Sequence, residues 1–498
     1  MDTTTSRPLS VLSAYRQAVY RCLTRARDAL FDLCDALATY PSARSFVELS
    51  QAPCFQRRWP RVYEALEDGR IDRPALRTLF RDTAPSPVPG ARRVWALDSS
   101  PLVRPYARTV PDRTLVHVPA AGQVLPPHTA PVRPGWAFST LVVLPPEPSS
   151  WTHILDNARI PSDQTALTVG AAQLAAFVPT RKAHADAGTD TGVEDPKDPK
   201  DPKDPKDLKD PKDPKGAATG AATGAAEDED ADWPLLLADG SYGTAGWVAA
   251  TAQLCLDQRV RAASTRVLYR AAPPPTGKPG RPREEGARFK GSDPATHGEP
   301  DAAWTGPDAR GQEVTVRCGG GLHRKECRAV PFTAVCLTRP TATDAKGDRR
   351  ETWFWWLGGR ALPPLAEVAR LYPRRFSIEH GYRFAKQDLL WTAPPVRTPE
   401  QMERWTDVVA VVHHESGLAR PQAQAQRLPW EDPTRPLSPR QVRRVLARIL
   451  AQEGTPAAPP RPRGQSPGRA RGAIVRPAPR HPVIRKGPAR RSTRHRAA

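Results

Sequence analysis

The sequence contains little that is typical of an exported or membrane-embedded protein. Its seven cysteines are odd in number and include no CxxC pair, so they predict no disulfide framework, and we expect a reducing compartment. The first ten residues, MDTTTSRPLS, lack a basic segment followed by an apolar stretch, so no signal peptide is expected. No apolar run approaches the ~18 residues that a membrane-spanning helix requires. We therefore expect a cytoplasmic protein without a membrane partner.

Acidic residues are missing from the C-terminal region. Between Gly454 and Ala498 there are eleven Arg and one Lys but no Asp or Glu, so this stretch carries +12 of the +21 net charge. Such an excess favours a polyanionic partner, and nucleic acid is the commonest one. A tail that only increases solubility is the alternative. We expect this tail to be disordered and to bind by charge alone.

The 58 prolines divide the chain into segments. Its length predicts two to four domains. An apolar stripe at helical spacing predicts helices within 8–83, and a Pro-rich stretch follows. Residues 195–215 repeat the tripeptide DPK, which forbids a packed core and indicates an extended linker. The predicted parts are a helical region (1–85), an α/β region in three pieces (90–180, 233–269 and 351–450), a linker (181–232), a β-rich insertion (270–350) and a basic tail (451–498).

Short β-branched and aromatic runs predict the elements of the α/β region. Strands are expected at 92–98, 113–118 and 136–144, followed by a helix at 162–178 and a strand at 233–239. The order strand, strand, strand, helix, strand resembles ribonuclease H-like folds, in which the first and fourth strands lie side by side. The expected fold class is therefore α/β with a ribonuclease H-like mixed sheet.

Two of these strands end in a carboxylate. Asp98 closes VWALD and Asp239 closes LLLAD. A charge at the end of an apolar strand is costly unless the strand opens on a functional crevice. Either residue could instead be an ordinary turn or cap residue. If the two strands are neighbours, the two carboxylates meet despite their separation in sequence.

The segment LYPRRFSIEHGYRFAKQDL carries a sharper pattern. Tyr372, Arg375, Glu379 and Lys386 stand at offsets that place them on one face of a helix. Pro373 is tolerated in a first helical turn, so the helix is expected to start near Tyr372. The alternative is an Arg–Glu pair on a solvated helix face.

The spacing Tyr372-x2-Arg375-x3-Glu379-x6-Lys386 resembles the Y-R-E-K signature of the insertion-sequence transposases of family four, a DDE group. The contexts LDSS and LADGSYG are similar to the first and second catalytic motifs of that family. The resemblance covers roughly residues 90–420 and includes a β-rich insertion between the second Asp and the Glu. It implies a DNA transposase with a ribonuclease H-like catalytic domain and an N-terminal region that binds DNA.

The resemblance also implies roles for individual residues. Asp98, Asp239 and Glu379 would ligate two Mg²⁺ or Mn²⁺ ions, as hard oxygen donors. Tyr372, Arg375 and Lys386 would contact phosphates near the transposon end. Some family members stack a flipped base on a Trp of the insertion, and Trp304 is the candidate here.

The family's chemistry is hydrolytic nicking, often hairpin formation, and then strand transfer by the freed 3′-hydroxyl. The implied partners are double-stranded DNA, as terminal inverted repeats and target, and a second copy of the chain in a synaptic homodimer. The implied location is the nucleoid of a bacterial cytoplasm. Two alternatives are another ribonuclease H-like nuclease and a non-catalytic DNA-binding protein derived from a transposase.

Three weaker signals remain. The stretch 279–283, PGRPR, resembles the core of a minor-groove AT-hook and makes Arg281 and Arg283 candidate DNA contacts. A loop that touches only phosphates, or a plain surface loop, is the alternative. Cys318, His323 and Cys327 lack an evident fourth zinc ligand. The sequence His413-His414-Glu415 follows an apolar helical stretch and is expected to form its solvated end.

Overall fold

The computed structural model describes residues 10–88, 90–118, 131–182, 233–274, 281–343, 349–461, 468, 470–474 and 476–486, and leaves the side chains of 341–343 and 349–350 undescribed. The predicted DPK linker lies outside the described residues except for Arg181 and Lys182. No helix in the described part of the chain is long and apolar enough to cross a membrane.

The N-terminal region is helical, as its apolar stripe predicts. Ser10 and Asp72 accept hydrogen bonds from the backbone N–H groups of Ser13 and Ala75, which caps the first and last of these helices. A short antiparallel ribbon joins the helices. The elements are α1 (Val11–Cys22), β1 (Leu23–Arg25), α2 (Arg27–Thr39), α3 (Phe46–Leu49), α4 (Pro60–Asp68), β2 (Arg70–Ile71) and α5 (Arg73–Asp82).

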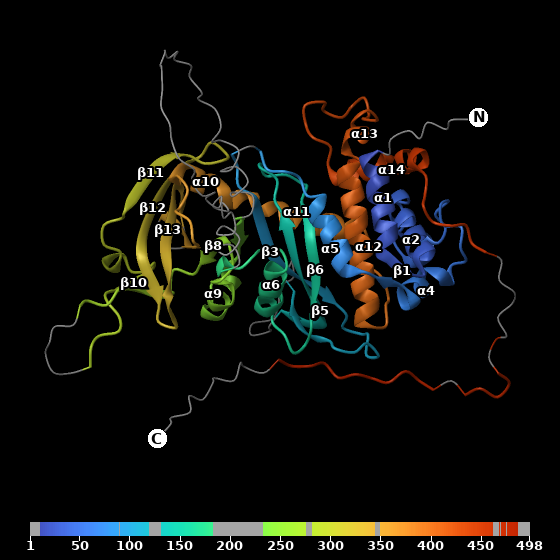
Figure 1. Cartoon of the computed structure of the whole chain (residues 1–498), viewed down its shortest axis with the longest axis horizontal. Coiled ribbons are helices and arrows are strands. Elements are labelled where there is room, and N and C mark those ends of the chain that lie inside the picture. Colours follow the sequence, from blue (N-terminus) through green and yellow to red (C-terminus); the bar gives the residue numbers. More distant parts are fainter. Residues whose placement is uncertain are drawn as a thin grey trace, which may run out of the picture.

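A large mixed sheet forms the centre of the molecule (Figure 1). Its first part comprises β3 (Val94–Val103), β4 (Thr114–His117), β5 (Val132–Val143), β6 (His153–Ile160), β7 (Leu235–Ala238) and β8 (Asp257–Ala262), with α6 (Ala166–Ala175), η1 (Gly240–Tyr242) and α9 (Ala245–Thr251). β3 is antiparallel to β5 and parallel to β7, and β7 is parallel to β8. The order β6-β5-β3-β7-β8 is consistent with a ribonuclease H-like transposase fold.

One strand of this arrangement was not predicted from the sequence. β6 has the sequence HILDNARI, in which Asp156 and Asn157 interrupt the apolar run although both are buried. The strand at 113–118, predicted as the second of the three, is β4, which pairs with β5 at the sheet edge. The antiparallel unit of the central sheet is therefore β3-β5-β6, and β7 joins it in parallel at β3.

The predicted insertion extends the same sheet. Its elements are β9 (Val267–Arg270), β10 (Arg288–Lys290), η2 (Pro294–Thr296), β11 (Ala302–Pro307), β12 (Glu313–Arg324), β13 (Cys327–Thr343) and β14 (Arg349–Leu357). β14 pairs with β13 on one side and with β8 on the other. The boundary predicted at residue 350 therefore falls inside a strand that joins the insertion to the central sheet.

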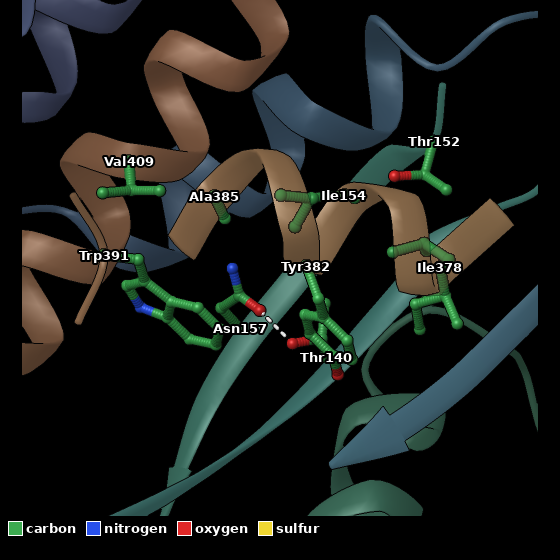
Figure 2. A pocket seen from close by; sticks show the side chains of 11 residues that line it. Thr140, Thr152, Ile154, Asn157, Ile378, Tyr382, Ala385, Trp391 and Val409 are labelled. Carbon is green, nitrogen blue, oxygen red and sulfur yellow. Dashed lines mark hydrogen bonds between the residues drawn. The ribbon is translucent and has the colours of Figure 1, made fainter. Parts of the chain in front are cut away.

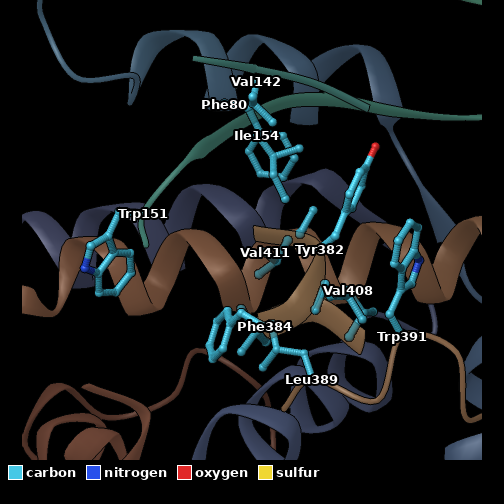
Figure 3. Packing of buried hydrophobic residues seen from close by; sticks show 14 of the residues in the cluster. Phe80, Val142, Trp151, Ile154, Tyr382, Phe384, Leu389, Trp391, Val408 and Val411 are labelled. Atoms are coloured by element: carbon cyan, nitrogen blue, oxygen red, sulfur yellow. The ribbon is translucent and has the colours of Figure 1, made fainter. Parts of the chain in front are cut away.

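The C-terminal helices cover the sheet and join the N-terminal ones. They are α10 (Leu365–Arg374), α11 (Phe376–Gln387), α12 (Pro399–Leu418), α13 (Arg420–Gln424) and α14 (Pro439–Glu453). In Figure 1, α1, α2 and α4 gather beside α12 and α14 at the end of the molecule opposite β10–β13. Figure 3 shows Phe80, Ile154, Tyr382 and Val411 packing together from α5, β6, α11 and α12. The N-terminal helices and the catalytic region thus share one core.

The end of α12 corrects a prediction. His413, His414 and Glu415 are buried, with 1%, 3% and 0% of their surface exposed, and do not form a solvated helix end. Glu415 is buried because the Arg16 guanidinium of α1 donates to it at 2.8 Å, and Arg16 also reaches Asp35 of α2 at 2.7 Å. α12 is long enough to present this polar end to α1 and α2 while its middle packs on the sheet.

Part of the predicted disordered tail has a defined position. The backbone N–H groups of His481 and Ile484 donate to the carbonyls of Arg108 and Arg113, and Ile484 forms a parallel bridge with Thr114 of β4. The Arg113 guanidinium donates to the carbonyl of His481 at 3.0 Å. The expectation of disorder is therefore wrong for this segment, since the backbone groups at an edge strand accept it as a partner.

Candidate active site

The parallel pairing of β3 and β7 brings two carboxylates together. The last paired residues are Leu97 and Ala238, and Asp98 and Asp239 are the next residue on each strand. Leu97 and Ala238 are fully buried and hold this end of both strands in the core. Asp239 directly follows β7, whereas Asp98 lies within β3, which continues to Val103, so the predicted end of that strand at residue 98 is wrong. The two residues nevertheless stand side by side where the pairing of β3 with β7 ends.

The junction between α10 and α11 places the other signature residues. The helix expected to begin near Tyr372 begins instead at Leu365, and Pro373 lies in the last turn of α10. Arg375 ends α10 and precedes α11, so Tyr372 is on a different helix from Glu379 and Lys386. The single helix face predicted from the offsets is therefore wrong, because the chain breaks after a proline that cannot donate its backbone N–H.

A cleft of about 660 Å³ nevertheless joins most of these residues. Asp98 and Asp239 line it from the sheet, and Tyr372, Arg375 and Glu379 line it from the helix junction. The Tyr372 ring packs against Phe354, with 4.7 Å between the ring centroids, which fixes it at the wall of the cleft. Among the predicted site residues, two neighbouring strands and one helix junction thus present three carboxylates, a guanidinium and a phenol to one space.

Arg375 is the main counter-charge in this cleft. One of its terminal nitrogens lies 2.9 Å from Oδ2 of Asp98 and 3.9 Å from Oδ2 of Asp239. Burial raises the pKa of Asp98 to about 6 although Arg375 opposes the shift, and Asp239 and Glu379 raise it further. The negative charge of the carboxylates in the cleft therefore exceeds the positive charge of Arg375.

Contacts behind the cleft hold Asp98 in position. The Tyr382 hydroxyl of α11 donates to the main-chain carbonyl of Asp98 at 3.0 Å. Figure 2 shows Tyr382 between Ile378 and Ala385 of α11 and the hydrogen-bonded pair Thr140 and Asn157 of β5 and β6. This packing fixes the distance between α11 and β3, and therefore between Glu379 and Asp98.

The donor set has the chemistry of a divalent-cation site. Three carboxylates offer the oxygen ligands that Mg²⁺ and Mn²⁺ prefer, and their mutual repulsion favours a cation between them. In the described part of the chain, no group of three or more His, Cys, Asp or Glu stands close enough to hold an ion as the side chains lie. The Arg375 nitrogen between Asp98 and Asp239 supplies positive charge at that position. The residues fit the ions by donor type and charge.

Two predicted DNA contacts do not line the cleft. Lys386 Nζ lies 5.7 Å from the centroid of the Tyr382 ring, on the same helix as Glu379. Trp304 of β11 packs against the core, with its ring over Gly306, where an added Cβ would come within 2.4 Å. The insertion therefore does not present Trp304 to the carboxylates in this structure.

The insertion contributes other residues that sequence reasoning missed. Glu351, Thr352 and Trp353 of β14 line the cleft, and the Trp353 indole donates to Glu351 at 3.1 Å. Arg261 of β8 lines it as well. The run TWFWWL predicts a strand but not its neighbours, so only the β14–β8 pairing identifies these side chains as part of the cleft.

The structure also places the residues of the weaker sequence patterns. Arg281 is exposed and pairs with Glu284, and Arg283 is also exposed, while 279–280 lie outside the described residues. His323 pairs with Glu285 at 2.6 Å, and Cys318 is buried in a strand. Within the residues that the structure describes, these groups form no metal site.

Comparison with known proteins identifies the family of this chain. A family model described as "DDE superfamily endonuclease" matches residues 18–325, which is more than half of the chain. The chain belongs to this family. The matched stretch includes Asp98 and Asp239 and ends before Glu379.

Two other comparisons add less. A solved structure titled as the cryo-EM structure of the piggyBac transposase synaptic complex with hairpin DNA is 7% identical, with a TM-score of 0.38. That match covers 90% of this chain and 72% of the other, and at such a TM-score it carries no information about the site. No curated protein matches this chain.

Proposed function

We propose that this DDE superfamily endonuclease is a DNA transposase that cleaves transposon ends and joins the 3′-hydroxyl to target DNA. The observation that carries the proposal is the cleft in which Asp98 and Asp239, from neighbouring parallel strands, face Glu379 across the α10–α11 junction. Carboxylates on two adjacent strands and on a covering helix form a rigid acidic site suited to phosphodiester chemistry.

The proposed cofactor is a pair of Mg²⁺ or Mn²⁺ ions held by Asp98, Asp239 and Glu379. Bound there, the ions would activate the attacking oxygen and stabilise the leaving oxygen. Asp98 is fixed by Tyr382 and by the backbone N–H of Ser99, which donates to its Oδ1 at 2.8 Å. The rigid strand supplies the positional precision that in-line displacement requires.

The chain's cations and phenol are proposed to hold the DNA backbone. Arg375 has a planar guanidinium suited to a phosphate, and its Nε has no hydrogen-bond partner among the described residues. Tyr372 stands beside it in the cleft, and Lys386 follows on α11. These positions support the Y-R-E-K assignment, although Tyr372 is on its own helix.

The assembly proposed is a homodimer on two DNA ends, with double-stranded DNA as both donor and target. Outside the cleft, the strongly basic C-terminal region supports DNA binding by charge. A bacterial cytoplasmic location completes the proposal.

The test is cleavage and strand transfer on labelled DNA that carries the inverted repeats flanking the gene, with Mg²⁺. Asp98→Ala, Asp239→Ala and Glu379→Ala should each lower cleavage about a thousandfold, which corresponds to about 4 kcal/mol of transition-state stabilisation. Asp432→Ala is the matched control, because Asp432 pairs with Arg435 at the surface. It should cleave like the wild type.

Three results would contradict the proposal. Nicking without strand transfer would identify another ribonuclease H-like nuclease. Binding of the repeats by a wild type that never cleaves would identify a non-catalytic derivative. Full activity of the Glu379→Ala variant would show that the third acid lies elsewhere.

A further inference from the structure

A second cavity, of about 300 Å³, lies at the start of β3, on the N-terminal side of Asp98. It is lined by Val94 at the start of β3, by the Pro-rich connection 85–88 and by the ends of α10 and α12. Its walls are largely apolar, and they include Leu144, Pro145 and Trp151. The site described above uses none of its lining residues.

The charged residues of this cavity are all basic. Arg92, Arg93, Arg374 and Arg420 line it, and no Asp or Glu is among the described residues that do. Arg92 is already paired with Asp257 at 2.6 Å. The other three guanidinium groups retain N–H groups without a partner among the described residues and give the cavity a net positive charge, which would attract an anion.

Hydrogen-bonding capacity is left unused in each of those three side chains. The Arg93 Nε is buried without a hydrogen-bond partner in the described part of the chain. Arg374 donates its Nε to the Pro145 carbonyl at 2.9 Å, and its forked end makes no hydrogen bond or ion pair with the described residues. Arg420 lies over the Trp151 ring at 4.9 Å. A bound anion would satisfy these donors.

His413 supplies a different kind of partner. It lines the cavity, only 1% of its surface is exposed, and neither ring nitrogen has a hydrogen-bond partner among the described residues. Burial lowers the pKa of His413 to about 3, and His153 lowers it further, so the ring is neutral at pH 7. A neutral imidazole offers one donor and one acceptor, which suits the edge of a heteroaromatic ring.

We propose that this cavity binds a nucleoside monophosphate, with its phosphate on Arg93, Arg374 and Arg420 and its base between the apolar walls and His413. The volume of the cavity is in the range of pockets that enclose small ligands. Such a ligand would use three features of the described lining residues: their unpaired buried donors and acceptors, their apolar walls and the absence of carboxylates among them.

Arg374 also gives this cavity a route to the candidate active site. Its neighbour Arg375, at the same helix junction, reaches Asp98. A ligand held by Arg374 would therefore restrain the junction that positions Arg375. Binding itself does not depend on the transposase proposal, because none of the three carboxylates lines the cavity.

The experiment measures binding of AMP to the full-length protein by isothermal titration calorimetry at pH 7. Adenosine and ribose 5-phosphate serve as probes that lack the phosphate and the base. We expect AMP to bind at least about tenfold more tightly than either, since each omits one set of contacts worth about 1.4 kcal/mol. Arg93→Ala, Arg374→Ala and His413→Phe should each weaken AMP binding about tenfold.

Arg435→Ala is the matched control, because Arg435 is an exposed arginine that pairs with Asp432 and does not line the cavity. Circular dichroism establishes that each variant is folded, and Arg420→Ala at the cavity rim replaces any that is not. The proposal is overturned if AMP does not bind the wild type, if ribose 5-phosphate binds as tightly as AMP, or if the cavity variants bind AMP as the control does.

Discussion

At the residue scale, Arg375 is the side chain that links the acids to the rest of the protein. Its guanidinium is mostly buried and pairs with Asp98, while Tyr372 stands beside it. Burial alone would lower the pKa of Arg375, but Asp98, Tyr372 and Asp239 raise it, so the cation is retained at neutral pH. In the absence of divalent ions, Arg375 stabilises the carboxylates of Asp98 and Asp239.

Replacing Arg375 with Gln should therefore destabilise the metal-free protein. The carboxylate of Asp98 would lose its buried partner, which costs about 1–3 kcal/mol. Divalent ions should restore the loss, so Mg²⁺ or Ca²⁺ should raise the Tm of Arg375→Gln more than that of the wild type. Differential scanning fluorimetry with and without each ion measures both effects.

The control is the double variant Asp98→Asn/Arg375→Gln, which lacks both the charge and its partner. Its Tm should respond to the ions less than that of Arg375→Gln. Equal Tm shifts in all three proteins would show that Arg375 and the ions do not share a site.

Single residues also show what the sequence can predict about the site. Asp98 and Asp239 could be predicted because each follows an apolar run, and the two strands that contain these runs are neighbours in the sheet, although β3 continues beyond Asp98. Trp353 could not be predicted, because it enters the cleft through the pairing of β14 with β8, which joins residues almost a hundred positions apart. Trp304 was the candidate from the sequence because nothing in the sequence shows that the core covers its side chain.

At the element scale, the break between α10 and α11 shows what the spacing of residues in the sequence cannot predict. The offsets of Tyr372, Arg375 and Glu379 fit one helix, but the structure forms two that meet at Arg375. Three of the four signature residues still reach one cleft, because Arg375 between the two helices itself keeps helical backbone angles, with φ −57° and ψ −29°. The pattern thus indicated proximity correctly and local structure incorrectly.

The same scale shows why the polar end of α12 could not be predicted. The sequence His413-His414-Glu415 has the composition of a solvated helix end, yet it is covered by residues from α1, α2 and α5. The Phe80 and His414 rings lie 4.1 Å apart between centroids. Partners more than three hundred residues away convert a polar helix end into a buried one.

The contact between α1 and α12 leads to a prediction about stability. Arg16→Met would leave Asp35 and Glu415 buried without their cation, and breaking such a pair costs about 3–5 kcal/mol. Urea unfolding should show this loss. Arg61→Met is the matched control, because Arg61 and Glu64 form a partly exposed pair worth at most about 1 kcal/mol. Equal losses in both variants would remove the buried network as a stabilising contact.

The buried histidines predict a dependence of stability on pH. His413 has a pKa of about 3 in the folded protein because of its burial, and the unfolded chain takes up a proton near pH 6.5. Its contribution is thus complete above pH 6.5 and is lost as the pH falls towards 3. The free energy of unfolding of the wild type should fall relative to His413→Phe by about 1.4 kcal/mol per pH unit in this window.

Comparison with the variant isolates His413 from groups whose contribution has the opposite sign. Burial raises the pKa of Asp407 to about 7, so that residue favours folding at lower pH. Urea titrations of both proteins at pH 7, 6, 5 and 4 measure the difference. A constant difference across the series would mean that His413 takes up its proton as readily in the folded protein as in the unfolded chain.

At the scale of the whole molecule, segments from opposite ends of the sequence pack together. The first helices pack on α12 and α14, and the segment around Ile484 joins the edge strand β4. The predicted boundary near residue 85 divides the sequence but not the core. The spacing of the apolar residues predicted the helical character of this region. Only long-range packing decides that these helices share one core with the rest of the chain.

The basic tail allows the whole-molecule charge to be tested against DNA. A chain that ends at Lys486 lacks four arginines but keeps Ile484 and Lys486, which bind the β4 edge and the carbonyl of Pro161. A chain that ends at Glu453 lacks all twelve basic residues of the tail. Because each phosphate contact contributes about 0.9 to the slope of log K against log salt, the first truncation should reduce the slope by up to about 4.

The second truncation should reduce the slope further and should also lower the Tm, because it removes the contacts of His481 and Ile484 with the loop and strand at Arg108–Thr114. Fluorescence anisotropy on a fixed duplex between 50 and 300 mM salt, about the range over which such contacts lose several orders of magnitude in affinity, separates the two effects. An unchanged slope and an unchanged Tm in both chains would mean that the tail acts on solubility alone. A lower Tm with an unchanged slope would assign the tail to the fold, through the β4 edge, and leave DNA binding to the cleft and its arginines.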